Sequence, residues 1–291
     1  MTAQQAIVLA LQASIMMTVF GFGLEASPGD VLYVVRRPSL LGRSLLAMFV
    51  IMPAFAILVV KVFALPPPVE IALVALSISP IPPILPARQL RVGGDASYGL
   101  GLMVITGLLS ILIVPVAVEI LARSLTRPFA MPPAAIARVV LLIAILPLAA
   151  GVACRAMWPA VAARIAKPID LIAKVGLVIG VLAILASVVP AIFSQAGEGA
   201  IAAMAAFVVV GLAVGHWLGG PDADHRPVLA LSTASRHPAI ALAIAKANFP
   251  DEPYLGAAIV LFLLVNLLVA VPYLRRQKQR LTAASKPAVS G

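Results

Sequence analysis

The chain has 291 residues, of which 62% are hydrophobic and 11% are charged, against roughly 25% charged residues in a typical soluble domain. A soluble fold could not bury that much apolar side chain, so the mean hydropathy of +1.10 indicates an integral membrane protein. The net charge of +10 would suggest nucleic acid in a soluble protein, but the basic residues lie between apolar segments and at the C-terminus, so no nucleic-acid partner is expected.

Apolar segments of helix length follow one another along the chain. They are continuously apolar, unlike the alternating strands of a membrane barrel, so we expect an all-α polytopic membrane protein of about nine transmembrane helices. The first segment has no basic residue before it and no cleavage-site pattern after it, which favours a retained helix over a signal peptide. The predicted segments are residues 4–24, 39–63, 68–90, 96–122, 134–157, 168–190, 197–219, 226–248 and 254–274. They form one predicted transmembrane domain, residues 1–274, followed by a polar, disordered cytoplasmic tail, residues 275–291.

The third segment contains four prolines within eight residues, at positions 80, 82, 83 and 86. Each proline removes a backbone donor and clashes with a preceding carbonyl. The alternative is a set of kinks packed against neighbouring helices. So many prolines in one span favour an unwound crossing, in which Pro83 lines the substrate site.

The eighth segment carries the run Ser232-Thr233-Ala234-Ser235-Arg236-His237-Pro238 in the middle of an otherwise apolar span, so this helix is predicted to be interrupted as well. With nine spans, segments three and eight run in opposite directions, and each is the penultimate span of its half. Paired interrupted helices at corresponding positions of two inverted halves point to a transporter site. We therefore expect an inverted repeat with two crossed interrupted helices.

The basic residues of the short loops fall mainly on one side of the predicted spans, including Arg36, Arg91, Arg164 and the tail from Arg275 onward. The cytoplasmic side of a membrane protein carries the excess of Lys and Arg. This predicts an inner-membrane protein with its N-terminus outside and its C-terminus in the cytoplasm.

Several short stretches resemble the bile acid:sodium symporter family, and the resemblance covers almost the whole chain. They are Phe20-Gly21-Phe22-Gly23-Leu24, the loop from Asp30 to Pro38, Ile51-Met52-Pro53, and Gly94-Asp95. The resemblance implies a core of two crossed broken helices beside a panel, alternating access, and organic anions such as bile acids, pantoate or 2-keto acids as substrates.

The positions that match the family's sodium ligands depart from its pattern. The Ser and Asn ligands of the third span fall on Leu85 and Pro86. The Ser and Thr ligands of the next helix fall on Gly99 and Met103, and a Gln ligand falls on Met48. In the eighth span the shared Glu becomes Ser232 and the Gln becomes Arg236. Sodium, like other hard cations, needs several oxygen ligands. We therefore predict that Arg236 replaces the ion, and that no metal or cofactor is bound.

Each predicted substrate-binding residue also has a structural interpretation. Arg236 within a span is functional by default, but it can snorkel or pair with a carbonyl. His237 can carry protons or make a structural hydrogen bond. Ser232, Thr233 and Ser235 can donate to a substrate or bond to the preceding turn, and Asn266 can line the cavity or join helices.

No enzyme signature such as HExxH, a P-loop or GxSxG is present, so no enzymatic activity is expected. The sequence predicts a secondary transporter of a small carboxylate-type organic anion, not classically sodium-coupled, that works by alternating access in a lipid bilayer. Two alternatives stay open: a sodium symporter of the bile acid, pantoate or keto-acid type, and a membrane binding or sensor protein without transport. Proton coupling, exchange and facilitated diffusion remain possible within the leading interpretation.

Overall fold

The computed structural model of the chain describes residues 3–26, 28–82, 84–122, 138, 141–195 and 197–284. Its regular elements within these ranges are all helices, which confirms the all-α prediction. Among the described residues, five helical stretches are long and apolar enough to cross a membrane, and two shorter apolar helices accompany them. The chain is therefore a multi-pass membrane protein. The count of nine spans, the inverted repeat and the orientation stay predictions.

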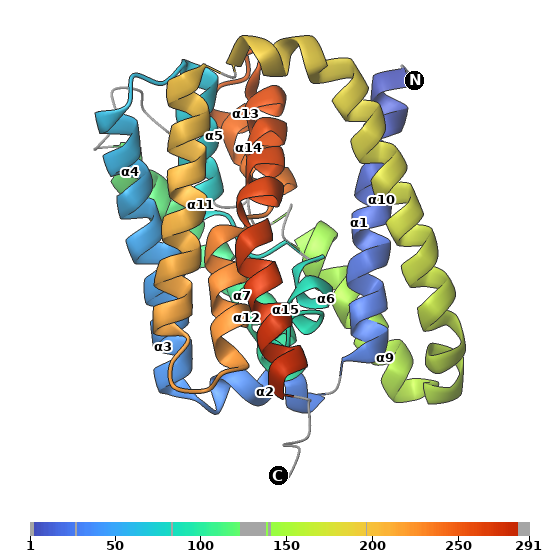
Figure 1. Cartoon of the computed structure of the whole chain (residues 1–291). Helices are drawn as coiled ribbons and strands as arrows, with labels where there is room; N and C mark the ends of the chain where they lie inside the picture. The colour runs from blue at the N-terminus through green and yellow to red at the C-terminus, as the bar shows by residue number, and fades with distance from the viewer. Residues whose placement is uncertain are drawn as a thin grey trace.

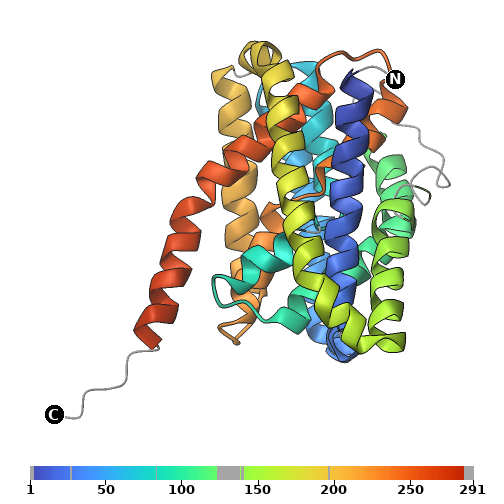
Figure 2. The same cartoon turned by 90° about the vertical axis from the view of Figure 1, so that its right-hand side faces the viewer.

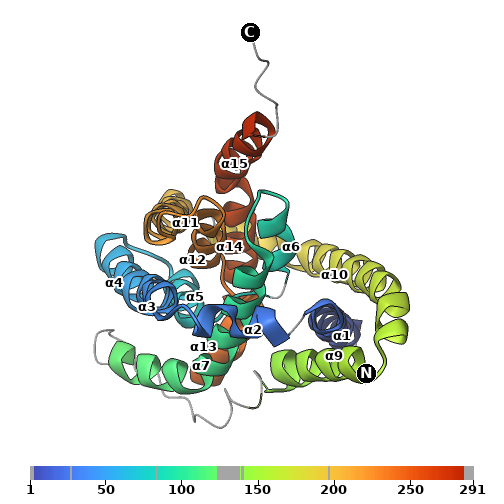
Figure 3. The same cartoon turned by 90° about the horizontal axis from the view of Figure 1, so that it is seen from below.

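One group of helices is built from the beginning and the middle of the chain. It contains α1 (Ala3–Glu25), the π-helix η2 (Leu141–Ile145), α9 (Leu146–Met157) and the long α10 (Pro159–Gln195). The α1 and α9 backbones come close at a pair of glycines, since a Cβ atom on Gly23 would lie 2.8 Å from the Gly151 Cα. Figure 3 shows α1, α9 and α10 together on one side of the molecule.

A second, larger group holds the remaining helices, and α2 lies between the two groups near the centre of Figure 3. Its core is a continuous cluster of buried side chains that runs from Val34 to Ala270. The elements outside the first group are α2 (Pro28–Val35), α3 (Pro38–Leu46), η1 (Ala47–Ile51), α4 (Met52–Val62), α5 (Pro67–Ile78), α6 (Leu85–Leu90), α7 (Ala96–Ala122), α11 (Glu198–Leu218), α12 (His225–Ala234), α13 (Pro238–Asn248), α14 (Leu255–Val269) and α15 (Val271–Ala284).

Large apolar side chains cover the outside of the bundle. Leu112 is 70% exposed, Leu268 70% and Trp217 82%. Such side chains are unfavourable in water, and their exposure on helices of spanning length fits an outer surface that faces lipid.

Three glycines spaced four residues apart let α11 lie directly on α12. A Cβ on Gly211 would lie 2.8 Å from the Ala234 Cα, and a Cβ on Gly215 would lie 2.5 Å from the Leu229 carbonyl oxygen. A Cβ on Gly219 would lie 2.7 Å from the Arg226 Cα. Small residues at this spacing allow helices in membranes to approach closely, and Gly211 and Gly215 serve that purpose here.

The stretch His225–Asn248, formed by α12 and α13, is the innermost of the candidate spans. Its most apolar window is 78% buried, against 33–50% for the other four. In Figure 1, α12 occupies the lower half of the molecule and α13 the upper half, while α5 and α6 take the upper and lower halves in the opposite chain direction. Accordingly α13 packs on α5, and α12 packs on α6.

The polar C-terminal segment does not become irregular after Leu274. Residues 271–284 form α15, which projects away from the helical body (Figure 2). The expectation of disorder is therefore wrong for residues 275–284. The segment forms a helix because it is rich in Arg, Gln, Lys, Leu and Ala, which are strong helix formers. Residues 285–291 lie outside the described part of the chain.

Candidate functional site at the crossing of two interrupted helices

The first interruption separates α5 from α6. Helix α5 ends at Ile78, and Ser79 adopts an extended conformation with ψ 151°. In a continued helix the Ser79 carbonyl would accept from the residue four positions later, which is a proline without an N–H. The prolines thus both end the helix and release backbone carbonyls that need other donors. The predicted interruption is confirmed, although Pro83 itself lies outside the described residues.

The second interruption separates α12 from α13. Helix α12 ends at Ala234, Ser235 is extended with ψ 133°, and α13 begins with Pro238 at its first position. Proline is well tolerated there because the first N–H groups of a helix have no partner within it. His237 caps the new helix, with Nδ1 accepting from the Ile240 N–H at 3.4 Å. This interruption is also as predicted.

The two interruptions meet through their backbones. The N–H of His237 donates to the carbonyl oxygen of Pro80 at 2.9 Å, although the two residues belong to different broken helices. Irregular backbone at membrane depth is tolerated only where protein or a cavity satisfies its polar groups. Here the interruption between α12 and α13 supplies an N–H donor to a carbonyl of the interruption between α5 and α6.

The Arg236 guanidinium lies at this meeting point. The side chain is 1% exposed. One Nη donates to the Ser79 carbonyl at 3.3 Å, and the other donates to the Met48 carbonyl at 2.8 Å. Arg236 therefore joins three elements, namely the break before α13, the break after α5, and η1.

The Met48 carbonyl is available to Arg236 because of a local defect in its own helix. The Met52 N–H donates to the carbonyl of Ala47, five residues earlier, which is the π-helical hydrogen-bond pattern. The next residue is Pro53, which has no N–H to give. The π turn and the proline together release the Met48 carbonyl toward the crossing.

Two polar atoms at the crossing have no hydrogen-bond partner among the residues that the structure describes. They are Nε of Arg236 and Nε2 of His237, both buried. Because Nδ1 of His237 accepts the cap hydrogen bond, a neutral ring carries its proton on Nε2. Both unpaired atoms are therefore N–H donors. Buried donors without partners are rare in folded proteins, and their chemistry suits an anion.

Ser232 and Gln89 link α12 to α6. Nε2 of Gln89 donates to Oγ of Ser232 at 2.8 Å and to the Val228 carbonyl at 2.9 Å. Gln89 is 1% exposed. Gln89 was not among the predicted site residues. A lone glutamine within an apolar segment is the available signal for it, because polar side chains at membrane depth commonly join helices.

The remaining predicted residues make structural hydrogen bonds. Thr233 Oγ1 bonds to the Leu229 carbonyl one turn earlier, at 2.7 Å. Ser235 Oγ lies 3.4 Å from Oδ1 of Asn266, and Nδ2 of Asn266 donates to the Ala234 carbonyl at 2.9 Å. Asn266 thus ties α14 to the end of α12. These bonds leave the predicted substrate-binding roles untested.

The positions that match the family's sodium ligands are all buried. Leu85 and Met103 offer apolar side chains, Pro86 and Gly99 offer none with oxygen, and Met48 contributes only a carbonyl that Arg236 already uses. Within the described part of the chain, no group of three His, Cys, Asp or Glu side chains is placed to hold a metal.

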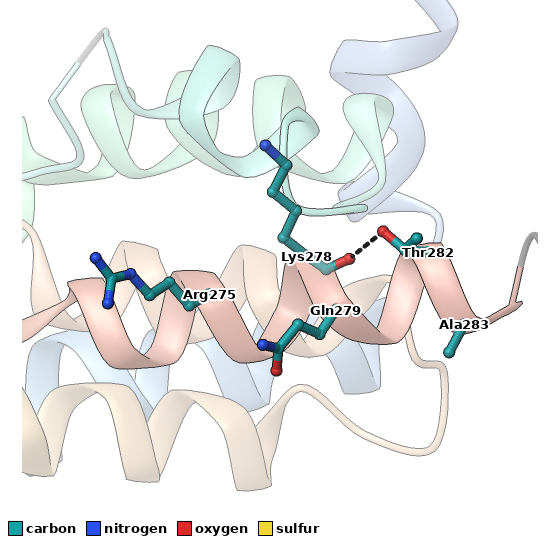
Figure 4. Close-up of a pocket in the computed structure, with 5 residues that line it drawn as sticks. All are labelled: Arg275, Lys278, Gln279, Thr282 and Ala283. Carbon is teal, nitrogen blue, oxygen red and sulfur yellow. Dashed lines mark hydrogen bonds between the residues drawn. The ribbon is translucent and has the colours of Figure 1, made fainter.

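Two surface hollows lie away from the crossing and share no residue with it. One is apolar and lies between α1, η2, α9 and α10, with Met16, Phe20 and Leu146 among its lining residues. The other follows one face of α15 and is lined by Arg275, Lys278, Gln279, Thr282 and Ala283 (Figure 4). In it, Thr282 donates to the Lys278 carbonyl at 3.1 Å.

An apolar helical domain with interrupted helices that meet deep in the protein is the architecture of secondary membrane transporters. The chain belongs to the Sodium Bile acid symporter family, whose model matches residues 12–195. That match includes the first interruption and Met48 but ends before α12. No curated protein matches the chain.

Proposed function

We propose that this protein is a secondary carrier of a small carboxylate-type organic anion, without classical sodium coupling. The observation that carries the proposal is the fully buried Arg236 guanidinium between two released carbonyls. An arginine inside a membrane domain is costly and is retained at functional positions. The predicted setting is the inner membrane, with the N-terminus outside and the C-terminus in the cytoplasm.

The donors left at the crossing favour an anionic substrate. The two Nη groups of Arg236 donate to carbonyls. Within the described part of the chain, its Nε–H and the Nε2–H of His237 remain unpaired. The amino terminus of α13 adds a positive dipole end beside them. A carboxylate would satisfy both donors and offset the charge of Arg236, which forms no ion pair with an acidic side chain of the described residues.

Sodium has little to bind at this crossing. The Met48 and Ser79 carbonyls already accept hydrogen bonds from a cation, and a guanidinium beside them would repel a sodium ion. Ser232 supplies its hydroxyl to Gln89. These contacts support a carrier in which Arg236 takes the place of a bound sodium ion. Its guanidinium stays in position permanently, donates to the released carbonyls and connects the two interruptions.

His237 is poorly arranged to carry the coupling proton. Its Nδ1 accepts the Ile240 N–H and caps α13. Protonation of Nδ1 would break this cap. The geometry therefore favours exchange or facilitated diffusion over proton symport.

Alternating access would expose the crossing to each side in turn. Arg236 and His237 are 1% and 2% exposed, so the present arrangement is closed around them. The first helix group, α1, α9 and α10, is the element expected to move relative to the larger group, in agreement with the panel and core that the family resemblance implies.

Transport by the purified protein in proteoliposomes tests the proposal. Uptake of labelled small carboxylates should be saturable, equal in sodium and choline media at constant ionic strength, and lost when Arg236 is replaced by Gln. A steep, saturable stimulation by sodium would favour the sodium-symporter alternative. Specific binding of a carboxylate without flux would favour a sensor.

A further inference from the structure

Helix α15 carries basic side chains that no acidic side chain balances. The chain has no Asp or Glu after Glu252, and none of the basic side chains of α15 forms an ion pair with an acidic side chain of the described residues. The helix therefore carries an uncompensated positive charge on an exposed segment. Its exposed basic residues are Arg275, Arg276, Lys278 and Arg280.

The neighbouring helix ends add to this positive charge. Three arginines lie near enough to His216 at the end of α11 for their charges to act on it, namely Arg226, Arg276 and Arg280. Arg226 belongs to α12 and donates to the carbonyls of the turn before that helix. Positive charge from α12 and α15 thus gathers where α15 leaves the helical body.

Helix α15 begins at the depth of the membrane interface. Nδ1 of His216 and the hydroxyl of Tyr273 are hydrogen-bonded at 2.8 Å, which places the first turn of α15 beside the last turn of α11. Trp217, the next residue of α11, is 82% exposed. Exposed tryptophan and tyrosine side chains are enriched where a membrane protein meets the lipid headgroups. The basic residues of α15 follow Tyr273, so they lie at the level of the headgroups.

The two faces of α15 differ in chemistry. Gln277 and Leu281, four residues apart and therefore on one face, lie toward the body, since Gln277 is 6% exposed and Leu281 lies against Gly93. The outward face has no large apolar side chain. Acyl chains would leave its charges without partners, which is costly. This face lines the hollow of Figure 4 with Arg275, Lys278, Gln279, Thr282 and Ala283.

We propose that the outward face of α15 binds the headgroups of anionic phospholipids in the leaflet on the side predicted to be cytoplasmic. Guanidinium and ammonium groups form strong, charge-assisted hydrogen bonds with phosphate oxygens, and a basic segment directly after a membrane span is attracted to anionic lipid. Helix α15 follows α14 directly and projects from the body (Figure 2). Arg275 and Lys278 contact the lipid phosphate, while Tyr273 and Leu281 keep the helix attached to the protein.

The test measures how far α15 is shielded from water in bilayers of different charge. Cys154 is the chain's single cysteine, so the full-length protein with Cys154→Ser and Gln279→Cys takes a fluorescent label at one position. It is reconstituted into phosphatidylcholine nanodiscs with or without phosphatidylglycerol. Quenching by acrylamide, which is uncharged, should be roughly two-fold weaker with phosphatidylglycerol. High salt should remove the difference, because it screens exposed charges.

Matched variants separate headgroup binding from a general effect of the bilayer. Arg275→Gln combined with Lys278→Gln should abolish the lipid dependence of quenching. Arg275→Lys combined with Lys278→Arg keeps both charges and should retain it. A label at Ala223→Cys, an exposed position in the turn between α11 and α12, should be quenched equally in both kinds of nanodisc.

Three outcomes would overturn the proposal. The first is equal quenching of the Gln279→Cys label in both kinds of nanodisc, and the second is an unchanged lipid dependence after Arg275 and Lys278 are neutralised. The third is equal shielding by inorganic phosphate in phosphatidylcholine nanodiscs at matched ionic strength, which would show a site for a free anion. The measurement needs no substrate and no flux, so its result is independent of the proposed transport.

Discussion

The backbone N–H of His237 donates to the carbonyl oxygen of Pro80 at 2.9 Å. The two residues are far apart in the chain and each lies in the gap of a broken helix, so this bond fixes where the two gaps meet. Arg236, the next residue back along the chain, reinforces the contact by donating to Ser79, the residue before Pro80. Two successive residues of one break thus bond to two successive residues of the other.

Removal of the Arg236 guanidinium should destabilise the protein strongly. In Arg236→Ala the Met48 and Ser79 carbonyls lose their donors, and each buried unpaired acceptor costs about 1–3 kcal/mol. Thermal unfolding in detergent should show the loss, and millimolar guanidinium ion should restore part of it by occupying the vacated space. Arg236→Lys should recover less than the wild type, since one ammonium lacks the planar fork.

Arg155 offers a matched control for Arg236. Its guanidinium also donates to two helix-end carbonyls, Leu24 at 3.1 Å and Glu25 at 2.5 Å, but the residue is exposed. Water can replace its hydrogen bonds, so Arg155→Ala should cost no more than about 1 kcal/mol and show no guanidinium rescue. Equal losses in the two variants would contradict a special role for burial at the crossing.

The interruption residues show how far sequence reasoning reaches. Prolines and a polar run predicted both breaks, because a missing N–H ends a helix wherever it occurs. The same reasoning could not predict that Met48 would supply a carbonyl, since that depends on a π turn meeting Pro53 at a site that faces Arg236. Gln89 was missed for a related reason, because its partners lie on a helix more than a hundred positions away in the chain.

A His237→Asn variant should separate the cap of α13 from substrate binding. Asparagine is a good helix N-cap, so thermal stability should change by less than about 1 kcal/mol, but the Nε2–H donor is lost. The half-saturating carboxylate concentration in proteoliposomes should rise several-fold with little change in maximal rate. His237→Ala should lose stability as well. An unchanged half-saturating concentration in the Asn variant would remove His237 from the anion site.

Replacing glycine by alanine should have opposite effects on stability at Gly215 in α11 and at Gly107 in α7. In Gly215→Ala the new methyl group would meet the Leu229 carbonyl at 2.5 Å, so α11 must separate from α12, at a cost of about 1–3 kcal/mol. Gly107 in α7 has nothing within 4 Å of its virtual Cβ, and Gly107→Ala should be neutral or stabilise by up to about 1 kcal/mol. Thermal unfolding of both variants checks this, and a neutral Gly215→Ala would contradict the observed packing.

Tyr33 predicts a stability change at alkaline pH. Its hydroxyl bonds to Nε2 of His225 at 2.9 Å, and burial, followed by the charge of Asp95, raises the pKa of Tyr33 above its ordinary value of 10.0. A raised pKa means that the folded state holds the phenolic proton more tightly than the unfolded state does. The resulting contribution to the free energy of unfolding is complete below pH 10.0 and is lost as the pH rises through the raised pKa. Tyr33→Phe should lack this part of the alkaline loss. Superimposable alkaline unfolding curves for the variant and the wild type would contradict it.

The most direct measurement is carboxylate uptake into proteoliposomes that contain the purified protein, with sodium and choline media compared for the wild type and for Arg236→Gln. We expect saturable uptake by the wild type that is the same in both media, and no uptake by Arg236→Gln beyond that of empty vesicles. Uptake that requires sodium, or that survives the loss of Arg236 unchanged, would contradict the role assigned to the buried guanidinium.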